Sequence, residues 1–406
     1  MSRFLFLFLL VFPKGGFKIA DLPITWGYLF LGAWAIYTAC NPLSIEKKYC
    51  QAMLCLLPFQ WLSACLLLIN GSTSIEYTIA FLTTFLFLPL LFFVSSPVWN
   101  LPIFIDMLKK GILFVSSYGL ILFGYQAITG DFFEIPFLTT NFNDYGLLLE
   151  KCNLRTLGIS KLISTYNNGN IYGLCLLMLL PLYCLNEPSK WKQTLVKLSI
   201  LLTLSRTVWI GLFIHELLFT LCIQKNSKSF VLKCVLSVLT ISFLILYLGL
   251  DASFIWDVTL GGRIDQLETF HQISLFSSRA FDGIAEIVYI GILSSFGAMG
   301  LLTFLGALVG PIALSASNRS PIHTAIRCGL CNYLLLCGSD GAILLIPVMA
   351  IFWLLTSLAL SETLAQQISA ANTDCLRREQ SFFRYNKAGR KDLFHPKSPQ
   401  SILQEK

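Results

Sequence analysis

Residues 261–302 read GGRIDQLETFHQISLFSSRAFDGIAEIVYIGILSSFGAMGLL, a charged segment that passes into a long apolar one. The apolar part predicts a helix over about residues 284–309, long enough to cross a bilayer. Glu286 falls just inside this predicted helix, and a carboxylate at the mouth of a membrane helix indicates a functional site. Arg263 and Arg279 precede it, and a guanidinium offers a fixed fork of donors that matches phosphate oxygens. We therefore expect a site for a pyrophosphate group at a membrane surface.

The composition indicates an integral membrane protein. Hydrophobic residues make up 55% of the 406 residues and charged residues 13%, which is too little polar surface to cover a water-soluble globule. Apolar runs of about 17 to 25 residues recur, and in a bilayer such runs form helices whose backbone groups satisfy one another. We expect an all-α polytopic membrane protein with about twelve transmembrane helices. The predicted helices cover residues 2–12, 23–41, 50–70, 77–95, 111–129, 170–186, 193–205, 207–223, 230–250, 284–309, 324–338 and 342–361.

Charge in the connecting segments predicts the orientation, because Lys and Arg accumulate on the cytoplasmic side of a membrane. With both ends of the chain inside, most of the 29 basic residues fall on the cytoplasmic side, and shifting the register by one helix reverses this asymmetry. The membrane domain is predicted to cover residues 1–361. Two long loops, at about residues 130–169 and 251–283, then face outward. Residues 362–406 are polar and basic, and we expect a flexible cytoplasmic tail.

Motifs for nucleotide or metal chemistry do not occur in the sequence. It has no P-loop, Rossmann fingerprint, HExxH or GxSxG motif, so any energy for chemistry must arrive in the substrate. We expect no cofactor, no metal and no nucleic-acid partner. The 13 cysteines are scattered through apolar segments, and Cys328 and Cys331 are interpreted as packing residues because no second pair completes a zinc site.

Asn168 and Asn170 lie in the outward-facing stretch STYNNGNIYG, directly before an apolar helix. Asn and Gly at such a place are typical of a turn with a helix N-cap. Alternatively, the amides and the exposed helix N-terminus bind hydroxyls or phosphate. Arg206 interrupts an almost continuous apolar run and either snorkels beside Trp209 or binds an anion. A charge at the centre of a membrane costs on the order of 2.5 to 3.5 kcal/mol, which favours a functional role.

Two further elements belong to the opening stretch. Arg263 and Leu267 are four residues apart, so they share a face of a short surface helix. Arg263 either pairs with a neighbouring acid, Asp265 or Glu268, or binds the ligand. His271 has a pKa suited to proton transfer. The next five residues of interest are spaced three or four apart and so are predicted to share one face of the following helix: Glu286, Tyr289, Leu293, Gly297 and Gly300. The two glycines would allow a neighbouring helix to pack closely.

Taken together, these motifs resemble the O-antigen polymerase (Wzy) and O-antigen ligase (WaaL) superfamily over about residues 165–305. The shared features are an Asn-rich loop entering an apolar helix with Leu-Pro-Leu, a Ser-Arg at a helix break, a Gly-Arg opening the large outer loop, and a closing helix with GxxG. The opening FPKGGFKIADLPITWGYL is also similar to members of this group.

The ligase branch is known for Arg-x3-Leu followed by His-Asn-x9-Gly-x2-Gly. Arg263 and Leu267 match the first part, and the two glycines of GAMG match the last. The histidine position, however, is Glu286, and the asparagine position is Ile287. An acid followed by an apolar residue and Tyr289 is more similar to polymerase-type members, so we favour the polymerase.

The resemblance implies a multi-pass enzyme of the bacterial inner membrane, with a glycosyltransferase-C-like fold and an active site facing the periplasm. It implies polymerisation of repeat units linked to undecaprenyl diphosphate into O-antigen, the glycan of lipopolysaccharide, or a related surface polysaccharide. The implied partners are a lipid-linked glycan donor and acceptor, membrane lipid, a chain-length regulator and a flippase.

The resemblance also implies residue roles. Arg206 and Arg263 are expected to bind the diphosphate, assisted by Arg279. Glu286 orients Arg263 or accepts the proton of the attacking hydroxyl, and further substrate contacts are expected from Asn168, Asn170, His271 and Tyr289.

Three alternatives stay open at this point. The first is an O-antigen ligase that transfers the glycan to lipid A-core. The second is a membrane transporter, since about twelve spans with both ends inside are common among secondary carriers. The third is a scaffold for other envelope enzymes.

Overall fold

The structure is a computed structural model that describes residues 6–19, 22–40, 45–94, 101–148, 160–225 and 273–362, together with residues 235, 239, 242 and 364. The chain divides into two compact units, Met1–Ser361 and Glu362–Lys406, and the first is described here. The predicted helix over 230–250, most of the predicted outer loop 251–283 and nearly all of the tail lie outside the described residues.

Helices account for most of the described residues, as expected for an all-α membrane protein. Among these residues, six helical segments are long and apolar enough to cross a membrane. They are α3 (Lys47–Asn70), α4 with η2 and α5 (Ile75–Val94), α6 (Leu101–Thr129), α8 (Gly169–Asn186), α10 with η6 (Arg206–Gln224) and α14 with η8 (Val288–Ser317). The shorter elements are η1 (Leu7–Val11), α2 (Trp26–Ala39), η3 (Phe142–Asp144), η5 (Ser164–Tyr166), α9 (Lys190–Leu201), α15 (Pro321–Leu336) and α16 (Ile346–Leu360). About twelve spans and a glycosyltransferase-C fold stay predictions.

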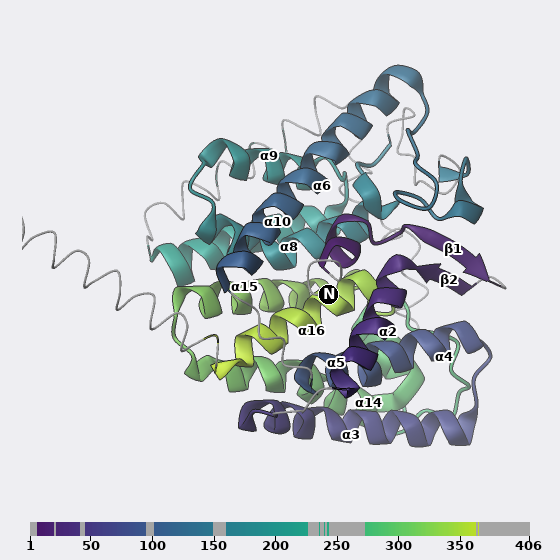
Figure 1. The fold of residues 1–406 in the computed structure, drawn as a ribbon. Coiled ribbons are helices and arrows are strands. Elements are labelled where there is room, and N and C mark those ends of the chain that lie inside the picture. Colours follow the sequence, from purple (N-terminus) through teal and green to yellow (C-terminus); the bar gives the residue numbers. More distant parts are fainter. Residues whose placement is uncertain are drawn as a thin grey trace, which may run out of the picture. The chain divides into compact units, whose positions relative to one another are not determined.

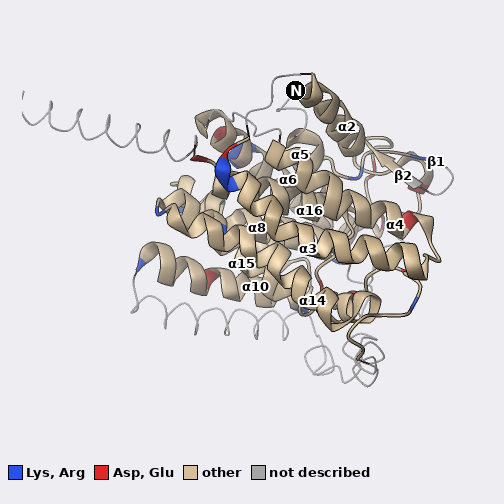
Figure 2. Ribbon diagram, turned by 90° about the horizontal axis from the view of Figure 1, so that it is seen from below, with Lys and Arg blue, Asp and Glu red and all other residues tan. Residues whose placement is uncertain are grey.

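Helices α8 and α16 form the interior of the unit (Figure 1). Every residue of α16 is buried, and so is almost all of α8, which packs against α15, α10, α16 and α6. A helix that is apolar on all sides belongs inside a bundle. By contrast α3, which packs along α14, exposes large side chains such as Trp61 (76% exposed) and Leu68 (86%). Figure 2 shows that charged residues lie mainly at helix ends and in loops, which suits contact with lipid along the helices.

Three glycines allow α8, α10 and α15 to approach closely. A Cβ on Gly329 of α15 would lie 2.0 Å from the carbonyl oxygen of Met178 in α8. A Cβ on Gly173 of α8 would lie 2.4 Å from Val208 of α10, and one on Gly211 would meet side chains of both α8 and α15. Small residues at such contacts let membrane helices pack backbone to backbone.

The segment before α2 corrects the all-α expectation. Strands β1 (Gly16–Ile19) and β2 (Leu22–Thr25) form an antiparallel hairpin, so α2 begins at Trp26 and not at residue 23 (Figure 1). Gly16 has a φ of 144°, and a Cβ there would lie 2.2 Å from the carbonyl oxygen of Ile24. The backbone N–H of Trp26 donates to the Gly15 carbonyl at 2.9 Å, which holds the hairpin against the start of the helix.

The predicted glycine face of α14 is wrong. Gly297 has φ 77° and ψ −175°, so it breaks the helix instead of lying on one of its faces. The backbone N–H groups of Ala298 and Met299 bond at 3.0 and 3.1 Å to carbonyls of the incoming loop, those of Ser274 and Leu275. Glu286 lies before the first residue of α14 and is not on that helix either. A Cβ on the other predicted packing glycine would meet Phe296 of its own helix.

The contacts between loops fall into two groups, one at each end of the helices. At the end that holds Asp340, which we call the site end, they join loops that the orientation argument places outside the membrane: Lys18 with Asp144, Asn170 with Asp340, and Ser72 with Phe281. At the other end they join loops placed inside: Lys109 with Glu187, and Lys48 with Asn318.

The close contact at Gly329 yields a stability prediction. Gly329→Ala is expected to lower the free energy of unfolding by about 1 to 3 kcal/mol, because the new methyl group overpacks against the α8 backbone. The thermal midpoint of the detergent-purified protein measures this. Gly124→Ala, in α6, is the matched control, since its Cβ would meet nothing within 4 Å. Equal midpoints for the two variants would contradict the close approach of α8 and α15.

Candidate functional site

Four helices begin around one short connection, residues 337–345, which we call the Asp340 loop. The helices α8, α10 and α14 are joined to this loop by hydrogen bonds, and α16 begins directly after it, with Leu345 as its N-cap. The bonds run from Asn170 Nδ2 to Asp340 Oδ2 (2.7 Å), between the Thr207 and Ser339 hydroxyls (2.9 Å), from Val288 N to the Cys337 carbonyl (3.0 Å), and from Gly341 N to the Glu286 carbonyl (3.2 Å).

Asn170 lies between two buried charged groups. Asp340 is 6% exposed and accepts from the Asn170 amide, and Lys161 is 5% exposed and donates from Nζ to Asn170 Oδ1 at 3.3 Å. Buried charges are costly unless they are paired and hydrogen-bonded. Helix N-termini add unsatisfied N–H groups and a partial positive charge to this region. The site end therefore favours negative charge.

The two asparagines of the predicted motif have different roles. Asn168 is the N-cap of α8, since its Oδ1 accepts from Asn170 N at 2.8 Å and Ile171 N at 3.3 Å. The N-cap interpretation is thus confirmed for Asn168. Asn170 lies inside the first turn, and its side chain is directed to Lys161 and Asp340.

Three of the other predicted site residues lie around the Asp340 loop. Arg206 is half-buried and is the first residue of α10, next to the Thr207 hydroxyl that contacts the loop. Glu286 is exposed, while its carbonyl accepts from the loop. The Tyr289 hydroxyl donates to the Leu334 carbonyl of α15. The segments that carry Arg206 and Glu286 are therefore attached to the same loop as Asn170, through the Thr207 hydroxyl and the Glu286 backbone carbonyl.

Arg279 belongs to a different set of elements. It lines a cavity of about 240 Å³ with Ser277, Ser278 and Ser294, beside the break in α14. Asn70, at the end of α3, donates from Nδ2 to the Ser277 carbonyl at 2.8 Å, so this segment is held by the α3–α4 turn. Arg263 and His271 lie outside the described residues, and their convergence with Arg206 stays a prediction.

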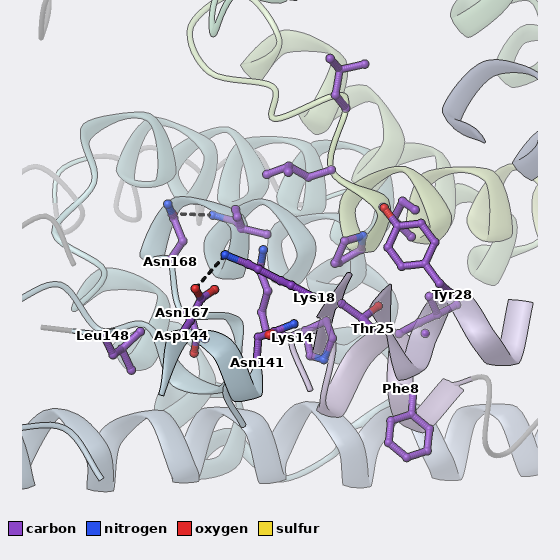
Figure 3. A pocket seen from close by; sticks show the side chains of 18 residues that line it. Phe8, Lys14, Lys18, Thr25, Tyr28, Asn141, Asp144, Leu148, Asn167 and Asn168 are labelled. Atoms are coloured by element: carbon purple, nitrogen blue, oxygen red, sulfur yellow. Dashed lines mark hydrogen bonds and ion pairs between the residues drawn. The ribbon is translucent and has the colours of Figure 1, made fainter. Parts of the chain in front are cut away.

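A larger pocket, of about 310 Å³, lies beside the α8 N-terminus and is lined in part by Leu344 and Leu345 of the Asp340 loop (Figure 3). Its polar side chains are Lys14 and Lys18 from the hairpin segment, Asn141 and Asp144 from the loop after α6, and Asn167 and Asn168. Lys18 Nζ contacts Asp144 Oδ1 at 2.7 Å. The sequence alone did not predict this pocket, although the lysines of PKGGFK were a signal for it. Lys18 and its partner Asp144 are 126 residues apart, so no local pattern connects them.

Burial lowers the pKa of the Lys14 ammonium, and the nearby Asp144 carboxylate opposes that shift. Within the described part of the chain, no group of three or more His, Cys, Asp or Glu side chains is placed to hold a metal ion. The cysteines that the structure describes are all free thiols.

The fold and the site define a mostly helical membrane protein with a polar site at one end of its helices. Comparison of the chain with protein-family models, with curated proteins and with solved structures gives no match.

The Asn170 bridge predicts coupling between two substitutions. Asn170→Ala and Asp340→Ala are expected to be non-additive in the free energy of unfolding by about 0.5 to 3 kcal/mol, because each removes the same hydrogen bond. Denaturation of the two single variants and the double variant in detergent measures this term. Asn168→Ala combined with Asp340→Ala is the control and should be additive, since the Asn168 side chain caps its own helix. Additivity of the Asn170 pair would mean that the bridge is not formed.

Proposed function

We propose that this chain is a glycosyltransferase of the bacterial inner membrane that polymerises repeat units linked to polyprenyl diphosphate into a surface polysaccharide. Its resemblance to the O-antigen polymerase group supports this, as does its membrane character. The observation that carries the proposal is the attachment of three segments to the Asp340 loop, where four helices begin: the segments are those of Asn170, of Arg206 with Thr207, and of Glu286.

A site of this kind suits a reaction whose leaving group is a lipid diphosphate. The main catalytic demand is to hold and neutralise the diphosphate, and arginine forks and helix N-terminal N–H groups do this at fixed positions. In the proposal Arg206 binds the diphosphate beside the N-terminus of α10, with Arg263 as a second ligand and Arg279 assisting. Carboxylates placed at the same end then need a role other than anion binding.

Glu286 is the proposed proton acceptor. The hydroxyl of the acceptor sugar attacks the anomeric carbon of the donor, the bond from that carbon to the diphosphate oxygen breaks, and the diphosphate leaves with the electron pair. The hydroxyl proton passes to the carboxylate of Glu286, an exposed residue whose backbone carbonyl accepts from the Asp340 loop. Asp340, which is buried and bonded to Asn170, keeps the loop in position.

Arg206→Ala is expected to abolish long-chain polymer and leave single-repeat glycan intact, because the diphosphate loses its fork of donors. Arg206→Lys should restore only part of the chain length. A gel of the surface glycan from a deletion strain that carries each variant measures both. Lys110→Ala, at an exposed residue near the other end of the helices, is the control. Normal chain length in Arg206→Ala, at a normal protein level, would reject the assignment.

Glu286→Gln is expected to slow polymerisation by about 100- to 10,000-fold, the usual contribution of a general base. Glu286→Asp keeps a carboxylate and should retain more of the rate. The measurement is polymer formation by the purified protein from lipid-linked repeat units. Equal rates for Glu286→Gln and the unchanged protein would exclude proton acceptance by this residue.

Deletion of the gene separates the polymerase from the ligase. Loss of a polymerase leaves one repeat unit on lipid A, whereas loss of a ligase leaves no glycan on lipid A. Arg263→Ala is expected to match the polymerase deletion.

A further inference from the structure

The proposed reaction does not use the pocket beside β1 and β2. Charged side chains gather on one side of this pocket. The charged residues that line it, among those that the structure describes, are Lys14, Lys18 and Asp144. Lys18 forms the ion pair with Asp144, and its backbone N–H donates to Asn143 Oδ1 at 2.9 Å. Lys14 is half-buried, and its ammonium makes no hydrogen bond to any residue that the structure describes. With both lysines protonated, the pocket therefore carries an excess of positive charge.

Asn141 supplies an independent sign of a ligand. It is 5% exposed, lines the pocket, and its Oδ1 accepts from the Asn143 N–H at 3.2 Å. Its Nδ2 is buried and has no hydrogen-bond partner in the described part of the chain. A buried donor without a partner costs free energy, so such a group in a pocket indicates an acceptor that binds there.

The opposite side of the pocket is apolar. Phe8 and Leu9 from η1, Tyr28 from α2, and Leu344 and Ile346 at the start of α16 line it. In Figure 3, Phe8 and Tyr28 lie on the far side of the pocket from Asn167 and Asn168. The volume is at the lower end of the range for small-ligand sites, which suits a head group with the first part of a chain.

We propose that this pocket binds the diphosphate end of an isoprenyl lipid through Lys14, Lys18 and Asn141, with the start of the isoprenyl chain against Phe8 and Tyr28. The identity of the lipid rests on the proposed function, since polymerisation needs two lipid diphosphates, a donor and an acceptor. One is assigned to Arg206 at the Asp340 loop and the second to this pocket. Asn168 and Leu344 line the pocket and Asn170 contacts Asp340, so the two sites adjoin at the start of α8 and the end of the Asp340 loop.

Farnesyl diphosphate is the probe for this site, titrated into the full-length protein in detergent and followed by calorimetry. Inorganic pyrophosphate, farnesol and phosphatidylglycerol, titrated separately, distinguish a free phosphate, an apolar ligand and a phospholipid. Lys14→Gln is expected to weaken farnesyl diphosphate binding by about tenfold or more, because it removes a charged donor. Lys14→Arg should bind within a few-fold of the unchanged protein, and Asn141→Asp, which adds a negative charge at constant size, should bind more weakly.

Lys110→Gln is the matched control, since this exposed lysine pairs with Asp106 near the other end of the helices. A thermal midpoint equal to that of the unchanged protein shows that each variant is folded. If Lys14→Gln fails this check, Asn141→Asp provides the test. Equal affinity for farnesyl diphosphate in the folded variants would overturn the proposal. Binding of pyrophosphate or phosphatidylglycerol as tight as that of farnesyl diphosphate would overturn the isoprenyl assignment.

The binding measurement tests the pocket and the polymer assay tests the proposed function, so either proposal can be rejected without the other. The pocket stands alone if farnesyl diphosphate binding depends on Lys14 while Arg206→Ala leaves the polymer unchanged. Conversely, the proposed function stands without the pocket if Arg206→Ala abolishes the polymer and neither pocket variant alters binding.

Discussion

The burial of the Asp340 carboxylate constrains the whole site end. A charge removed from water must recover its lost hydration from hydrogen bonds and opposite charge close by. The Asn170 amide provides one such bond and also accepts from Lys161, while the Thr207 and Ser339 hydroxyls fix the loop to α10. Satisfying this carboxylate thus brings Asn170 and Asp340, 170 residues apart, into contact. Separate bonds attach the segments of Arg206 and Glu286 to the same loop.

A second constraint comes from the break in α14. Backbone N–H groups freed inside a membrane protein need new partners, because lipid offers none. The carbonyls of Ser274 and Leu275 provide them, and only a residue that tolerates positive φ lets this segment approach at Gly297. The Thr73 N–H donates to the Phe281 carbonyl at 2.9 Å, so the incoming segment is also tied to the α3–α4 turn.

Local rules predicted much of this fold from the sequence. Hydropathy located the long helices, and the Asn168 N-cap follows from residue preferences at helix ends. The hairpin was missed because LPIT is apolar and continuous with the next helix, while its contacts depend on Asn143 and Asp144, more than a hundred residues away. The bridging role of Asn170 was missed for the same reason, since Asp340 is 170 residues distant. Sequence periodicity carries no signal for such pairings.

The first turn of α8 determines how the two proposed sites relate. Asn168 precedes the helix as its N-cap, with extended backbone, and lines the pocket, whereas Asn170 in the first turn contacts Asp340. Two anionic head groups, one in the pocket and one at the Asp340 loop, would both lie beside Leu344 and Leu345. Both would be near the same helix N-terminus, whose partial positive charge reduces the repulsion between them. In the proposal, a single helix start therefore serves both lipid diphosphates, the donor and the acceptor.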